Sequence, residues 1–317
     1  MMKLVRYILM ALVATVLTTS CIKDDLDECH NVTIYFQYLA DGDKDVLNQY
    51  MSKVDLYVFD SNGHILGVGS YNQDELTKFE AVPSFKLRPG QRYRVVAVGN
   101  PYDHTEVVNY ATETNFANIY LQDPAWSDPN VPVTNHDYNY LGEKEFVMPD
   151  QKGVMYRDTV TLYSAHVKVF VEIHGLPAPS GTRQTAGIPY QLSFENSNAQ
   201  VSFNNEINLN EKGSIYPDLI YDSENQCYRT QNLALFRMDS EGELSAEHCE
   251  HTLVLTDTNT GTELVRGNLY NYLVRNADVI DVTKQEAELP ISIVFSEMNV
   301  EIKVPDWVIV NGKPDWN

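Results

Sequence analysis

Two short clusters in the chain combine residue types that bind metal ions. Residues 41–45 (DGDKD) alternate carboxylates as a calcium loop does, but they lack the central glycine and the bidentate glutamate of an EF-hand. Residues 248–251 (HCEH) hold two histidines three positions apart, and this spacing places them on opposite faces of a strand. We therefore expect a solvated turn at the first cluster and no metal site at either.

Motifs that carry catalysis are also missing from the sequence. The chain contains no G-x-S-x-G, H-E-x-x-H, phosphate-binding loop or G-x-G-x-x-G pattern. Its 44 acidic residues outnumber 23 basic ones, for a formal charge of −21, whereas a nucleic-acid-binding protein needs a basic surface. We expect that the protein is not an enzyme, binds no cofactor and has no nucleic-acid partner. A hydrolase on a β scaffold is a further alternative. A pocket in which two carboxylates lie at the separation found in glycosidases would support it.

The chemistry that the sequence does indicate is attachment of a lipid. Lys3 and Arg6 precede an uncharged apolar stretch at residues 8–17, which is typical of a signal peptide and shorter than the roughly 20 residues of a membrane span. Residues 17–21 (LTTSC) resemble the lipobox at which bacterial lipoproteins are cleaved before a cysteine. The pattern predicts a signal peptide at residues 1–20 and a covalent lipid on Cys21. An ordinary secretory signal with an incidental cysteine is the alternative.

A charged cluster follows the proposed lipid site directly. Its members are Lys23, Asp24, Asp25, Asp27 and Glu28. An acidic run is unfavourable beside an anionic membrane surface, so the cluster does not indicate lipid binding. It resembles the acidic export signal of Bacteroidetes lipoproteins, which implies an outer-membrane lipoprotein exposed at the cell surface. A solvated spacer is the alternative, and in both cases residues 21–31 form a linker.

Three cysteines remain if Cys21 carries a lipid. They are Cys29, Cys227 and Cys249, an odd number in an oxidising compartment, so at most one disulfide closes within the chain. Cys227 and Cys249 flank segments that we interpret as adjacent strands, which makes them the candidate pair. Three buried free thiols are the alternative.

Short strands separated by turns account for most of the sequence. The Asn-Gly pair at 62–63 joins apolar runs as in a tight hairpin, and a Pro-Gly turn at 89–90 joins residues 85–88 to residues 93–98. A short helix is expected over residues 105–117. Further strands are expected at 32–38, 158–162, 166–173, 190–194, 199–203, 228–238, 252–255, 270–274, 291–295 and 300–304. This pattern predicts an all-β protein with one sandwich domain at residues 32–152 and another at 153–317.

Several segments, taken in order, resemble a known family. They are Cys21 with the acidic cluster, residues 54–60 (VDLYVFD), residues 95–100 (VVAVGN) after the Pro-Gly turn, and the closing residues 300–307 (VEIKVPDW). Together they resemble the FimB/Mfa-type fimbrial anchor family of Bacteroidetes. The resemblance implies two tandem transthyretin-like (Greek-key) β-sandwich domains in the lipid-anchored base or accessory subunit of a fimbrium. Its partners would be stalk subunits (fimbrillins), tethered to the outer membrane by β-strand addition.

The resemblance also implies a mechanism in which an arginine-directed protease removes the first strand of a stalk subunit and a neighbour's C-terminal strand fills the groove. No arginine occurs between Cys21 and Arg88, so we expect the first strand to stay attached and this chain to donate. The donor segment is expected at residues 291–310, with Ile291, Ile293, Phe295, Val300, Ile302, Val304 and Trp307.

A surface glycan-binding lipoprotein is the alternative function. The chain has 20 tyrosines, which would suit a carbohydrate-stacking surface, although aromatic residues are also favoured in strands. A flat aromatic platform with measurable affinity for oligosaccharides would distinguish this function from that of a fimbrial subunit.

Overall fold

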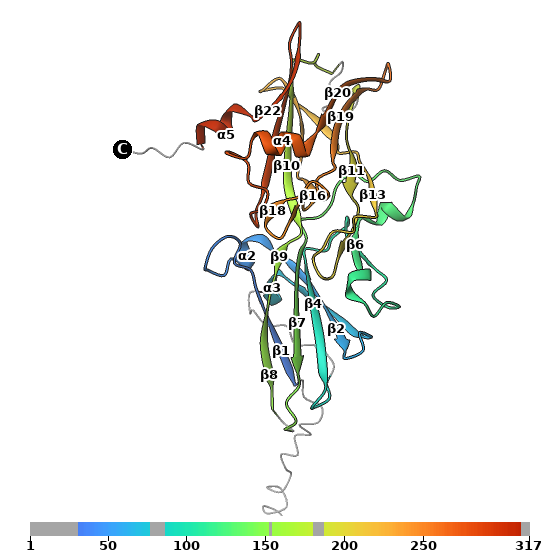
Figure 1. Cartoon of the computed structure of the whole chain (residues 1–317), viewed down its shortest axis with the longest axis vertical. Helices are drawn as coiled ribbons and strands as arrows, with labels where there is room; N and C mark the ends of the chain where they lie inside the picture. Colours follow the sequence, from blue (N-terminus) through green and yellow to red (C-terminus); the bar gives the residue numbers. More distant parts are fainter. Residues whose placement is uncertain (1–30, 77–85, 152–153, 180–186, 312–317) are drawn as a thin grey trace, which may run out of the picture.

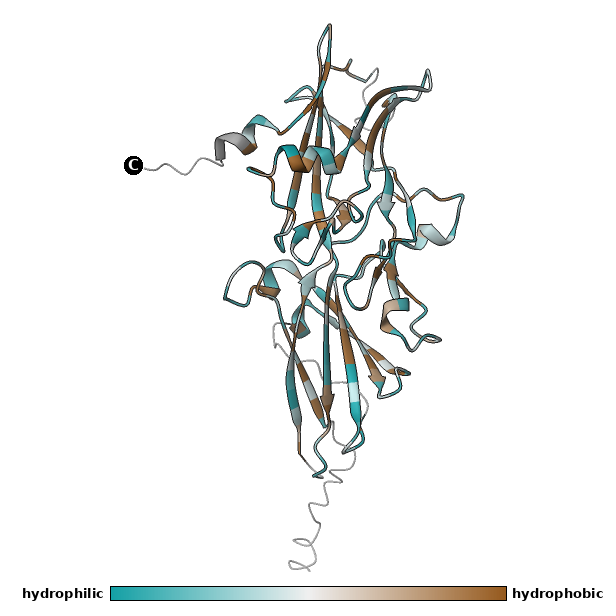
Figure 2. Ribbon diagram, in the orientation of Figure 1, coloured by the Kyte–Doolittle hydropathy of each residue, from teal (hydrophilic) through white to brown (hydrophobic). Residues whose placement is uncertain are grey.

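The computed structural model describes residues 31–76, 86–151, 154–179 and 187–311. Most of its regular structure is β-strand, as the sequence predicts. The molecule is elongated, with the N-terminal half at the lower end of Figure 1 and the C-terminal half at the upper end. Hydrophobic residues line the strands of both halves (Figure 2). The predicted signal peptide, Cys21, the acidic cluster and Cys29 lie outside the described residues.

Two sheets of the N-terminal half face one core. Five antiparallel strands pair in the order β3-β2-β4-β7-β9, and β1 pairs in parallel with β8. The core between them takes side chains from β1, β2, β4, β7 and β8. The elements of this half are β1 (Val32–Gln37), α2 (Leu47–Tyr50), β2 (Lys53–Asp60), β3 (Ile65–Asn72), α3 (Gln73–Leu76), β4 (Arg92–Gly99), β7 (Tyr140–Val147), β8 (Tyr156–Thr161) and β9 (Tyr163–Ser164).

The hairpin predicted at the Asn-Gly pair is confirmed between β2 and β3. Gly63 has a φ of +83°, and its N–H donates to the carbonyl oxygen of Asp60 at 3.1 Å. A Cβ at this position would clash with the carbonyl oxygen of Thr114, so the turn requires glycine on two counts. The Pro-Gly turn also forms, since Gly90 has a φ of +70°, but residues 86–88 before it are not a strand.

A third sheet connects the two halves. It contains β5 (Glu106–Val108), β6 (Tyr120–Gln122) and β12 (Val201–Ser202), and β12 reaches back from the C-terminal half to pair with β6. A second core lies between this layer and the outer face of the five-stranded sheet. The helix predicted over residues 105–117 is wrong, because that stretch holds β5 and only the start of the 3₁₀ helix η1 (Phe116–Asn118). A further 3₁₀ helix, η2 (Pro124–Ser127), follows β6.

Two larger sheets of the C-terminal half enclose a third core. One has the order β14-β15-β10-β21-β22, with β16 also paired to β10, and the other has the order β13-β11-β19-β20. The elements are β10 (His166–His174), β11 (Tyr190–Asn198), β13 (Lys212–Ile215), β14 (Leu219–Asp222), β15 (Cys227–Thr230), β16 (Leu233–Phe236), β17 (Asp239–Ser240), β18 (Glu243–Leu244), β19 (Thr252–Asp257), β20 (Thr262–Asn268), α4 (Leu269–Arg275), β21 (Glu288–Phe295), β22 (Val300–Lys303) and α5 (Asp306–Asn311).

Strand β8 lies in the N-terminal half, although the expected division at residue 152 assigns it to the C-terminal domain. It pairs with β1 over six residue pairs. Val160 and Leu162 belong to the N-terminal core, whereas Val167 belongs to the C-terminal core. This pairing favours a division between residues 162 and 167.

A partly buried polar cluster joins the halves. Glu286 accepts hydrogen bonds from Tyr38 Oη at 2.5 Å, Tyr140 Oη at 3.0 Å and Lys168 Nζ at 2.7 Å. We call these four residues the Glu286 junction. Burial, reinforced by the neighbouring Glu286 carboxylate, raises the pKa of Tyr38 and Tyr140, so both hydroxyls remain donors. The junction therefore ties the end of β1 and strand β7 to the start of β21.

Candidate functional site

Strand β1 is an internal part of the N-terminal half. Val32, Ile34 and Tyr38 have no exposed surface and Phe36 has 3%. The ring of Tyr38 packs edge-on against Tyr140 with the centroids 4.8 Å apart. Each of these side chains belongs to the core between the two sheets, so the chain fills its own first-strand position.

Strand β22 has the opposite character. Among the described strands it is the last in its sheet, and it pairs there only with β21, over four residue pairs. The turn before it closes with the N–H of Ser296 donating to the carbonyl oxygen of Asn299 at 2.9 Å. Antiparallel hydrogen-bonded pairs alternate, so Glu301 and Lys303 bond to β21 while the N–H and C=O groups of Val300 and Ile302 point outward. The backbone of β22 thus presents an open edge.

A groove of about 520 Å³ borders this edge. We call it the β22 groove, and it lies between β22, β20 and α4. Its apolar floor includes Leu253, Leu269 and Tyr272, which are 0%, 2% and 8% exposed. A Cβ on Gly267 of β20 would lie only 2.6 Å from Cδ1 of Ile302, so the two edge strands approach each other closely at one end. Helix α4 begins at Asn268, whose side chain accepts the N–H of Asn271 at 2.9 Å.

Charged side chains flank the groove. Arg266 is held by Glu195 at 2.7 Å and by Glu263 at 2.8 Å. Arg275 lies in the last turn of α4 and is exposed, and within the described part of the chain no carboxylate is paired with it. The groove therefore combines an apolar floor, an open strand edge and one available cation. Its members are far apart in the sequence, and only the strand order identifies them.

The predicted donor segment, residues 291–310, is not free in the structure. Ile291 and Ile293 have no exposed surface because β21 is an interior strand, paired in parallel with β10 over seven residue pairs. Val304 is 4% exposed and belongs to the same core. Phe295 is partly buried against it. Alternation of apolar residues identified the strands correctly. That pattern is the same for a strand that pairs within its own chain and for one that is donated to another subunit.

The end of the chain is helical rather than extended. Trp307 lies in α5 and is 45% exposed, and Lys303 Nζ contacts Asp306 at 3.0 Å at the start of this helix. Of the predicted donor positions, only Val300 and Ile302 lie on the open edge. Val300 is 38% exposed, and Met298 in the preceding turn is 96% exposed.

The predicted disulfide between Cys227 and Cys249 is not formed. Both thiols are free and buried. Cys227 begins β15 in the six-stranded sheet, whereas Cys249 precedes β19 in the facing four-stranded sheet, so the two are not on adjacent strands. Burial raises the pKa of Cys227, and it raises the pKa of Cys249 to about 12. Neither thiol is therefore activated.

The histidine and aspartate clusters occupy structural positions, and neither ring nitrogen of His251 has a hydrogen-bond partner among the described residues. His251 is fully buried, while His248 Nδ1 lies 2.9 Å from Ser245 Oγ. Asp41 accepts the N–H of Gln285 at 3.0 Å, so the predicted solvated turn contacts the C-terminal half. Among the described residues no three His, Cys, Asp or Glu side chains are grouped as metal ligands, and no helix is long and apolar enough to cross a membrane.

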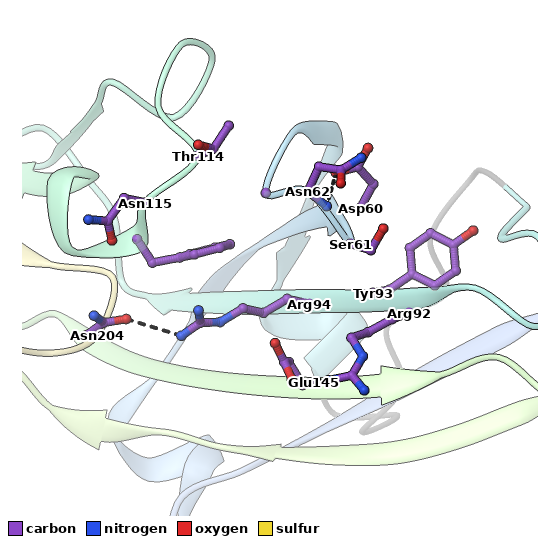
Figure 3. A pocket seen from close by; sticks show the side chains of 12 residues that line it. Asp60, Ser61, Asn62, Arg92, Tyr93, Arg94, Thr114, Asn115, Glu145 and Asn204 are labelled. Carbon is purple, nitrogen blue, oxygen red and sulfur yellow. Dashed lines mark hydrogen bonds and ion pairs between the residues drawn. The ribbon is translucent and has the colours of Figure 1, made fainter.

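A separate polar pocket lies in the N-terminal half beside the β2–β3 hairpin (Figure 3). It has a volume of about 290 Å³. The guanidinium of Arg94 lies 3.9 Å from the ring centroid of Phe116 and donates to Asn204 Oδ1 at 3.1 Å, and Arg92 pairs with Glu145 at 3.3 Å. Arg94 covers one face of the Phe116 ring, so the pocket offers hydrogen bonds rather than an aromatic platform.

Comparisons with known proteins agree with these features. A model for the family described as fimbrillin-A associated anchor proteins Mfa1 and Mfa2 matches residues 26–313. No curated protein sequence gives a match.

Three solved structures share the fold. A candidate adhesin from Bacteroides ovatus has 18% identity and a TM-score of 0.63, with 90% of this chain and 96% of that chain covered. A candidate polysaccharide-binding protein from Bacteroides thetaiotaomicron has 17% identity and a TM-score of 0.62, with 87% and 96% covered. The fimbrial anchor protein Mfa2 from Porphyromonas gingivalis has 17% identity and a TM-score of 0.58, with 86% and 97% covered.

The resemblance inferred from the sequence is thereby confirmed, and the family is one of anchor proteins rather than enzymes. The chain belongs to the family of fimbrillin-A associated anchor proteins.

Proposed function

We propose that this protein is the lipid-anchored base or accessory subunit of a fimbrium, which tethers fimbrillin stalk subunits to the outer membrane by β-strand addition. The observation that carries the proposal is the burial of β1. Its four inward side chains complete the N-terminal core, and no arginine precedes Arg88 in the mature chain. A subunit that keeps its first strand has no vacant groove for a neighbour, which suits the end of a fibre.

The same proposal assigns the segments outside the described residues. Residues 1–20 are the signal peptide, Cys21 carries the lipid, and Lys23, Asp24, Asp25, Asp27 and Glu28 direct the protein to the cell surface. Residues 21–31 then link the lipid to β1, which begins at Val32 at the lower end of the molecule (Figure 1). Because a lipid and the first strand are adjacent in the chain, tension on the fimbrium passes through β1.

We further propose that the two halves are tandem transthyretin-like β-sandwich domains. Two facing sheets around one core in each half support this assignment. The Glu286 junction supports a load-bearing role, because it connects β1 to β21, the strand that carries β22.

Mass spectrometry of the mature protein from washed outer membranes tests the proposal. We expect an acylated N-terminal Cys21, an intact β1, and fimbrillin subunits in the same complex. A mature N-terminus beyond Cys21, or a complex without fimbrillin, would show that the protein is not a terminal anchor.

Surface glycan binding is the second candidate function, and the pocket in Figure 3 is the observation that favours it. Its Asn, Asp and Arg side chains suit hydroxyl groups of a sugar, and one fold relative carries the description of a polysaccharide-binding protein. Titration calorimetry with oligosaccharides tests this function, with Asn62→Ala as the pocket variant. Absence of binding by the wild-type protein removes the candidate.

A further inference from the structure

We infer that the β22 groove receives an extended segment of a fimbrial subunit, which pairs with the outer edge of β22. This inference rests on the proposed function and names the surface that carries it out. On this inference the C-terminal region accepts a strand rather than donates one, because the first part of the expected donor segment, β21, is an interior strand of the sheet that forms the edge.

Backbone geometry points to a strand as the occupant. Val300, Glu301 and Ile302 all line the groove, although consecutive side chains of a strand point to opposite faces. The groove therefore borders the backbone edge of β22 rather than one of its faces. Val300 and Ile302 direct their N–H and C=O groups outward, and within the described residues these groups have no backbone partner. An added strand would supply the missing hydrogen bonds.

The walls of the groove define the chemistry of that strand. Leu253, Leu269 and Tyr272 form an apolar floor, which suits alternate apolar side chains such as Val, Ile or Leu. Arg275 stands at the rim without a carboxylate partner among the described residues, so the segment should carry Asp, Glu or a chain-terminal carboxylate there. A short apolar strand with one acidic position is therefore the expected occupant.

The position of the groove fits this role. The β21–β22 hairpin stands at the upper end of Figure 1, far from the start of β1 at the lower end. A stalk bound there would leave the lipid-linked end free to face the membrane. The hairpin turn also exposes Met298, which would contact a partner seated on the edge.

Site-specific photocrosslinking tests the surface in cells. A benzoylphenylalanine at Val300 should crosslink to one extended segment of a fimbrillin, and the same group at Val147, which is 52% exposed at the end of β7 in the N-terminal half, should not. Equal crosslinking from both positions, or a crosslink from Val300 to a second copy of this chain, would overturn the inference.

Two matched pairs of variants test the chemistry, with the fimbrillin recovered alongside the anchor as the readout. Ile302→Pro removes an outward N–H that β21 does not use, and with Ile302→Val as control we expect about a tenfold loss of recovered fimbrillin. Arg275→Glu should lower recovery severalfold, whereas Lys44→Glu, with the same change in charge on an exposed loop, should not.

Circular dichroism and a thermal melt establish that each variant is folded. If the wild-type anchor recovers fimbrillin and both variants recover it equally well, the groove is not the binding surface, although the anchor function stands. If the wild-type anchor recovers none, the proposed function itself fails.

Discussion

The strands nearest the two ends of the chain differ in what they offer a partner. β1 pairs with β8 over six residue pairs and places Val32, Ile34, Phe36 and Tyr38 in a closed core. β22 pairs over four residue pairs at the rim of its sheet, and its Val300 is 38% exposed. A partner would have to displace β1 to use the lower site, whereas it only has to extend the sheet beyond β22. A partner would therefore bind at β1 by strand exchange and at β22 by strand addition.

Energetics favour addition. Burial of a large apolar side chain stabilises a protein by about 1.5–3 kcal/mol, so exposing the four inward residues of β1 would cost roughly 6–12 kcal/mol. That cost is comparable with the whole stability of a typical domain, about 5–15 kcal/mol. Pairing with β22 requires only that a short exposed edge lose its water.

The largest effect is expected from Cys21→Ser, which removes the proposed lipid site next to β1 in the chain. If the lipid is the only attachment, this variant should be released completely from washed membranes, because the acyl chains supply the membrane affinity. Cys29→Ser is the control, since it removes a nearby cysteine and should leave the protein in the membrane fraction. Retention of the Cys21→Ser variant would contradict the lipid assignment.

Truncation of one isoleucine in each strand compares the two strands directly. Ile34→Ala should lower the free energy of unfolding by about 2–5 kcal/mol, since the residue is fully buried. Ile302→Ala should cost clearly less, because Ile302 is only partly buried. Urea unfolding measures both values. Equal losses would show that β22 is as internal as β1.

The contrast between β1 and β22 was only partly visible in the sequence. Alternating and β-branched residues predicted both strands, because burial of one face sets that pattern. The neighbours of each strand were not predictable, since the parallel pair of Val32 with Tyr156 joins residues far apart in the chain. For the same reason the sequence did not indicate that β8 pairs with a strand of the N-terminal half.

The Glu286 junction gave no local signal at all. Tyr38 directly follows β1, Tyr140 and Lys168 lie in β7 and β10, and Glu286 shortly precedes β21. Only the fold brings these residues together. The cysteine pair failed in a related way, because closeness in sequence suggested adjacent strands where the structure has facing sheets. The family resemblance predicted the overall fold well, but a resemblance does not state which edge is open.

Acid should lower the stability of the folded protein through three buried histidines. Burial lowers the pKa of His136, His166 and His251 to about 3, whereas in the unfolded chain the value is near 6.5. The unfolded state therefore binds protons first, and stability that is present above pH 6.5 is lost as pH falls toward 3. At pH 5.5 the expected loss is about 1.4 kcal/mol per histidine.

Unfolding by urea between pH 7 and 5 measures this dependence. His136→Phe is the informative variant, because neither ring nitrogen of His136 has a partner in the described chain and the ring stacks on Phe236. The variant should keep the fold and reduce the slope of stability against pH. An unchanged slope would mean that His136 does not remain neutral in the folded protein.

The coupling energy between Lys168 and Glu286 of the Glu286 junction should exceed that of a surface ion pair. Glu286→Gln should lower the free energy of unfolding by about 1–3 kcal/mol, because Lys168 and Glu286 are only 20% and 14% exposed. After Lys168→Met the same change should cost less. The pair Arg92–Glu145, at 62% and 55% exposed, is the control and should show coupling of less than about 1 kcal/mol. If the double-mutant cycles for Lys168–Glu286 and Arg92–Glu145 give equal coupling energies, the junction does not hold the two halves together more strongly than a surface ion pair.

The smallest effect is expected from deleting residues 306–317, and it distinguishes acceptance of a strand from donation. The deletion removes α5 but keeps Val304 and Pro305, which are buried and close the sheet beside β22. If the β22 edge accepts a partner strand, cells with the shortened protein should retain nearly all of their fimbriae. Stability should fall only modestly, because Asp306 and Trp307 are exposed and Val308 is only partly buried against the core. If the chain donates its C-terminal segment instead, fibres should appear in the medium. Counting fimbriae on cells and in the supernatant measures the outcome, and fibre release by a folded, lipidated variant would favour donation over the β22 edge.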